Sequence, residues 1–494
     1  MKAASIGSSL IEIIIATAVL TLGISAVLLL STANQTLRAD ALAEIEALGI
    51  AKEMIEDARA DSRGNFRNVV SINDPEKSLK VLDLSPCLKQ ISALITWALD
   101  ISRSRNIEIN SMLADLPEAF ALGGDCASSG PEGDWDNPET FGSVSFPSGI
   151  IGKDIDVILH GEKRYALLAT EHADIAKSDL WIIDVTDPPN PVTLSNLDLG
   201  LLGLNAVDAA RDNATGKIYV YAASNDDADA FQLQVIEITD PNNPNLVASR
   251  TLPGVSGACP FTCPGGRSIF YYNNYIYIGT HRLLVASPRH ELHVYNAQNP
   301  ASPVWVGSIK IDHNINDIIV TGDTAYLATS SDTEEIIVVD FKDKASPKQV
   351  GAFDAKRVDG GPSDEDGTEL FLIGHKLYLG RERVTNPNER DFYILDLNTF
   401  SILGSKRLGL MPNTEVSGIA IAGNFAFVAT TDPARGFQVW NIANPQDIKP
   451  QSACGTYNFS AGAAGIDFRD NFGFISAQSE TALRIIYDKP DICS

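Results

Sequence analysis

By residue type, the side chains of this chain that could do chemistry are seven histidines, six cysteines and 63 acidic residues. His290 and His293 stand three apart, a spacing that directs the two side chains to opposite faces of an extended strand. The chain has no His-Glu-x-x-His sequence, no Cys-x-x-Cys pair and no glycine-rich phosphate loop. We therefore expect surface or turn histidines and no enzyme. The histidines are His160, His172, His281, His290, His293, His313 and His375.

Three loops concentrate acidic residues, at Asn225–Asp229, Ser331–Glu335 and Asp359–Glu369. Calcium is the metal that such loops would suit, because hard cations take several carboxylate oxygens. None of the three loops has the spacing of an EF-hand. The simpler interpretation is a solvated acidic loop, so no cofactor is predicted.

The six cysteines suit three disulfides in an oxidising compartment. Sequence alone does not fix their pairing, and the pairs below are hypotheses. One pair would close a small region after the N-terminal helix, one would stiffen a short loop, and one would brace the chain end. These candidates are Cys87 with Cys126, Cys259 with Cys263, and Cys454 with Cys493.

The formal net charge of −25, from 63 acidic against 38 basic residues, argues against nucleic acid as a partner. Phosphate binding needs a basic face, whereas a strongly acidic surface keeps an extracellular protein soluble. The length of 494 residues is enough for two or three domains.

The N-terminal stretch is apolar or small from Leu10 to Leu30, with Glu12 as its one charged residue. That length is enough to cross a bilayer as a helix. Lys2 and Gly7 precede it, followed by Leu-Ile-Glu. An ordinary membrane anchor or a secretory signal peptide is the alternative, but a secretory signal is cleaved after its apolar core.

This order of basic leader, Gly and Leu-Ile-Glu resembles the class III signal of type IV prepilins. The resemblance implies cleavage after Gly7, so that Ser8 becomes the first residue and Glu12 the fifth. Ser8 stands where that family usually has Phe. In the family, the fifth-residue Glu pairs with the free N-terminus of a neighbouring subunit, which would explain a carboxylate in an apolar helix.

The helical pattern continues to residue 60, because apolar residues recur at steps of three and four. A coiled-coil stalk would show the same stripe, and the sequence leaves both readings open. The stripe consists of Leu37, Ala41, Ile45, Leu48, Ala51, Ile55 and Ala58.

Residues 61–137 form a small headpiece and linker in this interpretation. Ile91–Ile101 and Ile107–Phe120 are predicted as helices, although a pilin headpiece usually contains a β-sheet. Ala127–Asn137 has the Gly, Ser, Pro and acidic composition of a linker.

The remainder, 138–494, is internally repetitive. An apolar strand that ends in an acidic or amide residue recurs before a turn, at intervals of 44 to 59 residues, and about 45 residues suits one four-stranded propeller blade. The Asp-Pro-x-x-Pro turns are structural, because Asp caps its own turn and Pro fixes φ. The recurring strands end at Asp184, Glu237, Asn296, Asp340, Asp396, Asn441 and Tyr487.

The last repeat lacks its fourth strand, and Pro138–Phe146 repeats the Pro-x-x-apolar-Gly pattern of a fourth strand. We therefore expect this segment to close a ring of seven blades, with six blades as the alternative. The repeats resemble the LVIVD repeat, a β-propeller unit of bacterial and archaeal surface proteins. The resemblance is specific for fold, whereas propellers host many unrelated functions.

Together these expectations describe a fold class with a long N-terminal helix, as membrane or pilin stalk, and an all-β propeller. The expected divisions are a leader at 1–7, a helix at 8–60 with a transmembrane part at 10–30, a headpiece at 61–137 and the propeller at 138–494. The propeller would be extracytoplasmic, on a single-pass protein of the cytoplasmic membrane or on a pilus.

The expected function is that of a minor pilin or pseudopilin that presents the propeller for adhesion or recognition at a filament tip. Its partners would be a prepilin peptidase, other pilin-like subunits and an extracellular ligand. Two alternatives stay open: a membrane-anchored propeller scaffold outside any filament, and a propeller enzyme acting on a surface polymer.

Overall fold

The computed structural model divides into two compact units, Met1–Ala119 and Phe120–Ser494. The residues that it describes are 6–64, 69, 71–72, 74, 76–85, 88–100, 103–114, 133–160, 163–212, 215–224, 231–254, 265–282, 290–355, 365–382, 389–451, 456–459 and 461–489. In helix α1, side chains are described at 14–15, 17–31 and 40–62.

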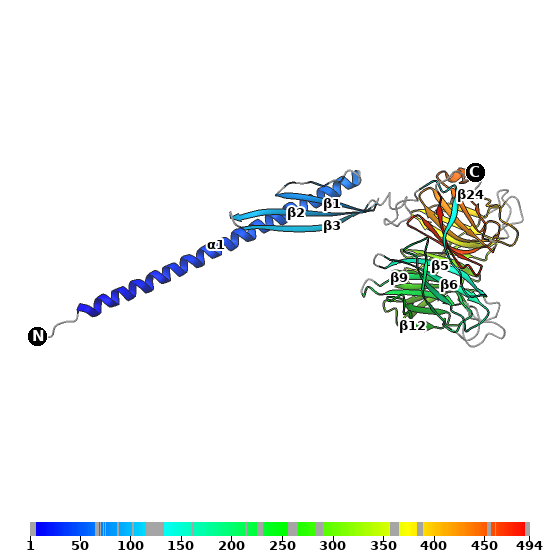
Figure 1. Cartoon of the computed structure of the whole chain (residues 1–494), viewed down its shortest axis with the longest axis horizontal. Helices are drawn as coiled ribbons and strands as arrows, with labels where there is room; N and C mark the ends of the chain where they lie inside the picture. Colours follow the sequence, from blue (N-terminus) through cyan, green and yellow to red (C-terminus); the bar gives the residue numbers. More distant parts are fainter. Residues whose placement is uncertain are drawn as a thin grey trace. The chain divides into compact units, whose positions relative to one another are not determined.

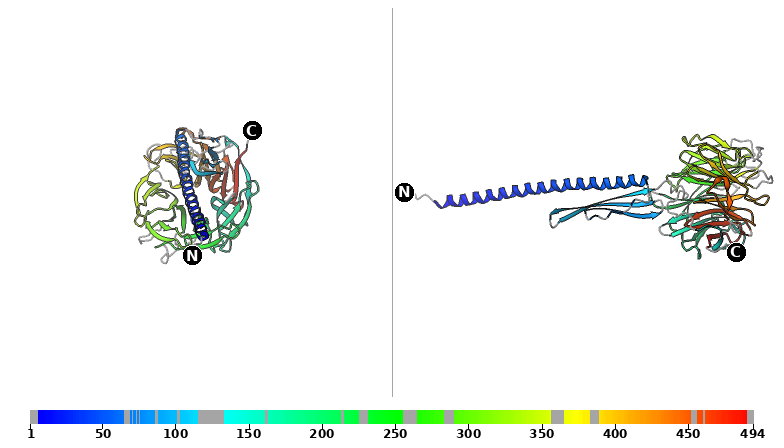
Figure 2. Two further views of the ribbon diagram at one scale, coloured as in Figure 1. Left: turned by 90° about the vertical axis from the view of Figure 1, so that its left-hand side faces the viewer. Right: turned by 90° about the horizontal axis from the view of Figure 1, so that it is seen from above.

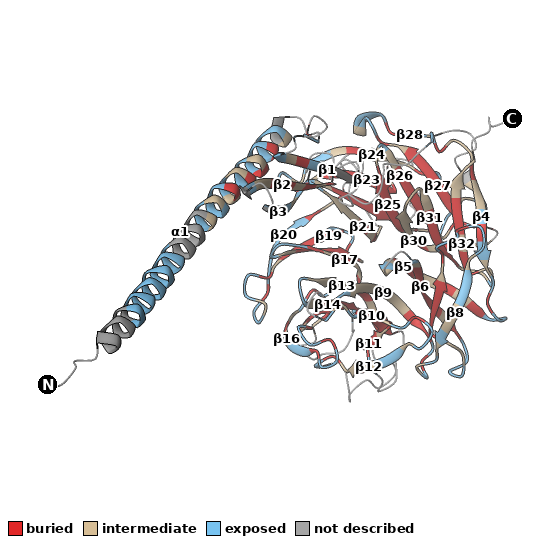
Figure 3. Cartoon of the chain, turned by 60° about the vertical axis from the view of Figure 1, so that its left-hand side comes forward, coloured by how far each residue is buried: buried red, intermediate tan, exposed pale blue. Residues whose placement is uncertain are grey.

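The first unit is a helix packed on a three-stranded antiparallel sheet of order β1-β2-β3 (Figure 1). A buried stripe on the second half of the helix, which includes Ala51 and Ile55, contacts Ile91, Ala93 and Ile95 of β2. Figure 3 shows this change along α1, from exposed to partly buried. The elements are α1 (Ile6–Gly64), β1 (Lys77–Ser85), β2 (Leu88–Asp100) and β3 (Arg103–Ala114).

The predicted fold class was wrong in its helical part. The described parts of the segments expected as headpiece helices form the strands β2 and β3. In β2 every second residue from Ile91 to Ile95 is apolar and buried, and in β3 Leu113 is buried while Ile107 and Ile109 are partly buried. The side chains that pack on α1 are two residues apart in β2, at Ile91, Ala93 and Ile95. This period of two is that of a strand with one covered face. Side chains of α1 are described mainly over two shorter stretches, 17–31 and 40–62. In the described residues, no helix combines the length and the hydropathy that a membrane crossing requires.

The described residues of the second unit form seven separate antiparallel sheets, which are arranged in a ring (Figure 2). Blade 1 consists of β5 (Ile150–His160), β6 (Lys163–His172), β7 (Leu180–Asp184) and β8 (Val192–Leu197). Blade 2 consists of β9 (Leu204–Arg211), β10 (Ile218–Ser224), β11 (Leu233–Glu237) and β12 (Asn245–Arg250). Blade 3 consists of β13 (Gly266–Tyr272), β14 (Tyr275–Thr280), β15 (Leu292–Asn296) and β16 (Val304–Ile309).

Blades 4 to 6 continue in the same order of strands, and blade 6 adds β29, which pairs with β27. Blade 4 consists of β17 (Ile315–Thr321), β18 (Thr324–Thr329), β19 (Ile336–Asp340) and β20 (Lys348–Phe353). Blade 5 consists of β21 (Gly367–Ile373), β22 (Lys376–Arg381), β23 (Phe392–Asp396) and β24 (Ile402–Lys406). Blade 6 contains β25 (Val416–Ala422), β26 (Phe425–Thr430), β27 (Phe437–Asn441), η2 (Pro445–Asp447), β28 (Lys449–Pro450) and β29 (Thr456–Tyr457).

Blade 7 joins both ends of the unit, as the sequence predicted. It contains β30 (Ala463–Arg469), β31 (Phe472–Ala477) and β32 (Leu483–Asp488), and its fourth strand is β4 (Pro138–Val144). The register places Leu483 opposite Val144 and Asp488 opposite Pro138. The expected closure of the last unit by the N-terminal segment is therefore confirmed. Among the described residues, six of the seven sheets have four strands and that of blade 6 has five.

The core of the ring lies between neighbouring blades. The second and third strands of each blade are apolar on both faces, because each sheet is covered by a sheet on either side. For example, Leu167 and Ile182 of blade 1 pack against Leu204 and Val220 of blade 2. Such packing positions the innermost strands around one axis.

In the Asp-Pro-x-x-Pro turn after β11, Asp240 accepts a hydrogen bond from the backbone N–H of Asn242 at 3.1 Å, as predicted. The residues that end the third strands make similar local bonds. Asp184 accepts a hydrogen bond from the backbone N–H of Thr186, 3.0 Å away, and Asp340 accepts one from Lys342 at 2.8 Å. Asp396 and Asn441 cap their turns in the same way. These repeat residues therefore have a structural role, because their side chains stabilise the turns.

Candidate functional site

The innermost strands of the seven blades surround a cavity of about 850 Å³. Each of these strands has a register irregularity near its beginning, where one extra residue is inserted. A bulge re-aims the side chain of its extra residue. All seven extra residues line the cavity, and they are Lys153, Asn205, Arg267, Asn316, Thr368, Ser417 and Ala464.

The cavity wall is strongly acidic. Its only strong bases among the described lining residues are Lys153, Arg267 and Arg469. Lys153 is already paired with Glu171 at 2.9 Å. The wall carries eight carboxylates, which are those of Asp154, Asp156, Glu171, Asp208, Asp317, Glu369, Glu415 and Asp467.

Most of these carboxylates join one blade to the next. The Asp154 carboxylate accepts a hydrogen bond from the N–H of Val207 at 2.8 Å, across the boundary between blades 1 and 2. Asp317 accepts one from Leu370 at 2.9 Å, between blades 4 and 5. Asp156, Asp208 and Asp467 accept similar bonds from Ala209, Tyr271 and Val157.

Amide and hydroxyl side chains make the remaining links. Asn205 donates to the carbonyl of Gly266, Ser268 to Ile315, Asn316 to Gly367, Thr368 to Val416 and Ser417 to Ala463. With the aspartate links, every boundary between consecutive blades is crossed by at least one hydrogen bond from an innermost strand. The polar lining therefore holds the ring together.

Burial is the main cause of the raised pKa values of the acids in the cavity. It raises the pKa of Asp154 to about 7, against the hydrogen bonds from Val207 and Ile155, which lower it. Burial likewise raises the pKa of Asp317 to about 6. The pKa of Asp156 rises to about 6 through burial and the neighbouring Asp467.

Glu369 and Glu415 differ from the other lining acids, because no residue in the described part of the chain donates a hydrogen bond to either carboxylate. Burial and then the charges of Asp317, Asp154 and Glu415 raise the pKa of Glu369 well above the ordinary value. Arg267 and Lys153 favour the charged form of Glu415, whereas the charges that act on Glu369 are all acidic, so Glu369 has the fewest described partners among the lining acids.

Two basic groups at the cavity, those of Arg267 and His281, have lowered pKa values. Burial lowers the pKa of Arg267, while Glu415 and Asp366 raise it. Burial, Arg267 and Lys153 together lower the pKa of His281 to about 4, so this imidazole is neutral at physiological pH. The arrangement can accept hydrogen bonds and attract positive charge.

The sequence-predicted site residues lie outside this cavity. Gly7, Ser8 and Glu12 fall within the backbone of α1, and their side chains are outside the described set. All six candidate disulfide residues, Cys87, Cys126, Cys259, Cys263, Cys454 and Cys493, lie outside the described residues.

Two histidines depart from the expected surface positions. His172 is buried with Asp179, and Nε2 lies 3.2 Å from a carboxylate oxygen. His293 is buried too, and its Nε2 lies 2.8 Å from the carbonyl oxygen of His290. Both rings sit in the packing of a blade, which a lone histidine in a sequence does not reveal.

The acidic loops have different outcomes. Asn225–Asp229 and residues 359–364 lie outside the described residues. In Ser331–Glu335, the Glu335 carboxylate is fully buried, lies 3.1 Å from the Arg381 guanidinium, and accepts the N–H of Ala355. Glu335 therefore has a structural partner.

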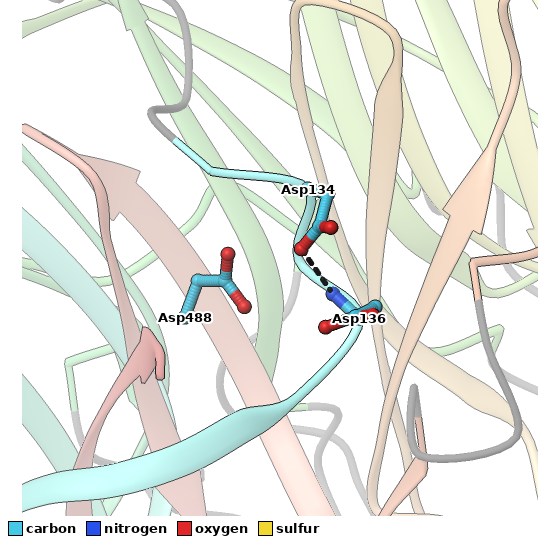
Figure 4. A group of neighbouring side chains, drawn as sticks. All are labelled: Asp134, Asp136 and Asp488. Carbon is cyan, nitrogen blue, oxygen red and sulfur yellow. Dashed lines mark hydrogen bonds between the residues drawn. The ribbon is translucent and has the colours of Figure 1, made fainter. Parts of the chain in front are cut away.

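A trio that sequence reasoning missed is Asp134, Asp136 and Asp488, which offer carboxylate oxygens within 4.8 Å of one another (Figure 4). Asp488 accepts the N–H of Trp135 at 2.9 Å. The Trp135 side chain is fully buried, with ring centroids 4.7 Å from Phe427 and 5.5 Å from Phe468. Asp488 comes near Asp134 and Asp136 only when the ring closes, so no local sequence pattern indicated this trio.

Comparison with known proteins supports the repeat architecture. The model of the LVIVD repeat family matches residues 414–445, which span most of blade 6. No curated protein matches the chain. The fold assignment rests on the sheets of the chain and on this repeat.

Several solved structures are similar at low identity. BamB from Moraxella catarrhalis is 9% identical, with 72% of this chain and 99% of that chain covered and a TM-score of 0.41. A chain of a mitotic checkpoint complex is 8% identical, with 70% and 93% covered and a TM-score of 0.45. The computationally designed Ika8 protein is 12% identical, with 71% and 99% covered and a TM-score of 0.43. Residues 414–445 are thus similar to an LVIVD repeat, set in a chain that folds as a seven-bladed β-propeller.

Proposed function

We propose that this chain is a minor pilin-like surface protein, whose N-terminal unit joins similar subunits and whose propeller recognises an extracellular ligand. The observation that carries the proposal is the surface of α1. Large apolar side chains are exposed on all its sides between Ile14 and Leu30, with Leu22 70% and Leu30 71% exposed. A helix that is apolar all round is normally covered by other apolar surface.

The second half of α1 supports the same reading. Its stripe is covered by β1, β2 and β3, so this part of the helix already has a partner within the chain. The sheet on the helix is the kind of headpiece that the pilin resemblance implies. The uncovered first half is then left for contacts with the helices of neighbouring subunits.

The proposal includes processing by a prepilin peptidase between Gly7 and Ser8, with Glu12 contacting a neighbouring subunit. It places the propeller outside the cytoplasmic membrane, on the cell surface or on a filament. A head of seven blades is bulky, which favours a low-copy or tip position.

The first test is the mass of the mature N-terminus of protein made in its own host. We expect a chain that begins at Ser8. An intact Met1, or cleavage near residue 30, would refute the pilin-like processing and leave an anchored or secreted propeller.

A second test is Glu12→Ala, with Glu53→Ala as the control on an exposed face of the same helix. We expect Glu12→Ala to abolish incorporation into filaments, because a buried amino terminus would lose its counter-charge. Co-purification with sheared filaments measures the effect. Equal incorporation of both variants would favour the membrane-anchored scaffold.

A further inference from the structure

We propose that the central cavity of the propeller binds an organic cation, a ligand with a protonated alkyl amine, and that Glu369 is its principal counter-charge. This inference names a ligand chemistry for the proposed recognition role but does not depend on filament assembly. The cavity volume of about 850 Å³ lies in the range of small-molecule sites.

The availability of Glu369 follows from its position in the sheet. Asp154, Asp317 and Glu369 occupy equivalent positions, immediately after the inserted residue of their strands. The two aspartates accept an N–H of the next blade. Glu369 has one more methylene group and makes no hydrogen bond to a described residue. Its carboxylate lines the cavity and is left for a ligand.

The charges around Glu369 favour a positive ligand. Asp317 on β17, Asp154 on β5 and Glu415 beside β25 act on it with the same sign. Like charges in a partly buried site repel, and a bound cation relieves that repulsion. The positive groups that line the cavity are Lys153, which is paired with Glu171, Arg469, which is paired with Asp467 at 3.4 Å, and Arg267. His281 is neutral near pH 7.

The spacing of the acids selects an extended cation over a metal ion. Within the described chain, Asp134, Asp136 and Asp488 are the one group of three acidic or histidine side chains with ligand atoms all within 4.8 Å. No three cavity carboxylates meet that condition. A metal ion needs several oxygens at 2.3–2.6 Å, typical of calcium, whereas an alkyl amine bridges more distant acids.

The other lining residues suit the carbon chain of such a ligand. Phe270, Tyr272 and Phe371 line the same cavity, together with Ile319 and Leu372. Aromatic faces attract ammonium groups and bury methylene groups. Carboxylates with aromatic walls together describe a site for an amine on an alkyl chain.

The test is isothermal titration of the full-length protein with cadaverine, a diamine, at about pH 8. We expect saturable binding, at least ten-fold weaker in Glu369→Gln and unchanged in Glu237→Gln. The control removes a carboxylate that is salt-bridged to Lys217 on the outer part of blade 2. Pentanediol, the neutral analogue, should not bind.

A second measurement needs no variant. Cadaverine keeps its charge to about pH 10, whereas the raised pKa of Glu369 means that this acid loses its proton only above its ordinary range. Affinity measured at increasing pH, below the pKa of cadaverine, should therefore rise as Glu369 loses its proton. Absence of binding by the wild type, pH-independent affinity, or equal affinity of Glu369→Gln would overturn the proposal, whatever the N-terminal mass shows.

Discussion

The aspartates of the innermost strands show how one residue type serves both fold and electrostatics. Each accepts a backbone N–H from the neighbouring blade, which satisfies a group that would otherwise be buried without a partner. The same burial raises the pKa of Asp154 to about 7. The acid therefore stabilises the ring most when it retains its proton.

This shift predicts a pH dependence of stability. Unfolded Asp154 has its ordinary pKa near 4, so between about pH 4 and pH 7 the folded state binds more protons than the unfolded state. Stability from this group then falls as pH rises through that window. From about pH 5 to about pH 8, the free energy of unfolding of the wild type should fall by on the order of 2 kcal/mol more than that of Asp154→Asn.

Urea unfolding at both pH values measures this difference. Asp343→Asn, in an exposed turn of blade 4, is the matched control and should follow the wild type. An identical pH slope for Asp154→Asn and the wild type would contradict the assignment.

At this scale, the sequence predicted turn residues better than cavity residues. Asp184 and Asp340 recur before turns, and a local cap depends on neighbours a few residues away. Asp154 and Glu369 have no such signature, because their partners come from other blades. Asp134 and Asp488 lie more than 350 residues apart, so only the closed ring explains their meeting.

Among the elements, α1 has two surfaces with different partners. Ile55 is 4% exposed on β1–β3, whereas Ile45, on the same helix, is 67% exposed. The two isoleucines allow one substitution to be compared in two environments.

Ile55→Ala should destabilise the N-terminal unit by about 2–5 kcal/mol, because it removes buried methyl groups from a packed interface. Ile45→Ala should change stability by less than about 0.5 kcal/mol, since it alters an exposed side chain. Hydrogen exchange of β2 amides in the full-length protein measures both. Similar exchange in the two variants would mean that the stripe does not hold the sheet.

The same unit explains where secondary-structure prediction went wrong. In β2, apolar residues also occur on the second face, at Leu94 and Ala98, so the alternation of Ile91, Ala93 and Ile95 is partly hidden. Helix and strand periods are then hard to separate over a short apolar run. The packing on α1 decides in favour of the strand.

For the whole ring, the fourth strands fit against the turns of the next blade at glycine. A Cβ on Gly142 of β4 would overlap the carbonyl oxygen of Pro188 in blade 1, and one on Gly307 would overlap that of Lys344. Gly351 occupies the equivalent place in blade 4, yet a Cβ there would meet only Val338, at 3.7 Å. The repeated glycine thus reflects blade-to-blade contact at some positions only.

Gly142→Ala should lower the stability of the ring by about 1–3 kcal/mol, because the added carbon forces β4 away from blade 1. Gly351→Ala should be neutral or stabilise slightly, since it finds ordinary space and restricts the unfolded chain. Thermal unfolding of the full-length protein compares them. Equal melting temperatures would show that β4 does not seat against that turn.

The ring was predictable because repetition multiplies a weak signal. Seven copies of a strand-and-turn pattern and one displaced Pro-x-x-apolar-Gly segment indicated the blade number and the closure. The cavity was not predictable, because its chemistry arises only when seven innermost strands meet.

The buried Trp135 has a mechanical consequence. Its ring lies between Phe427 of blade 6 and Phe468 of blade 7, and its backbone N–H donates a hydrogen bond to Asp488. Tension that arrives along the preceding segment meets this anchor before it reaches the β4–β32 ladder. The pull is thereby shared between two blades, so the ring would resist being opened at its first strand.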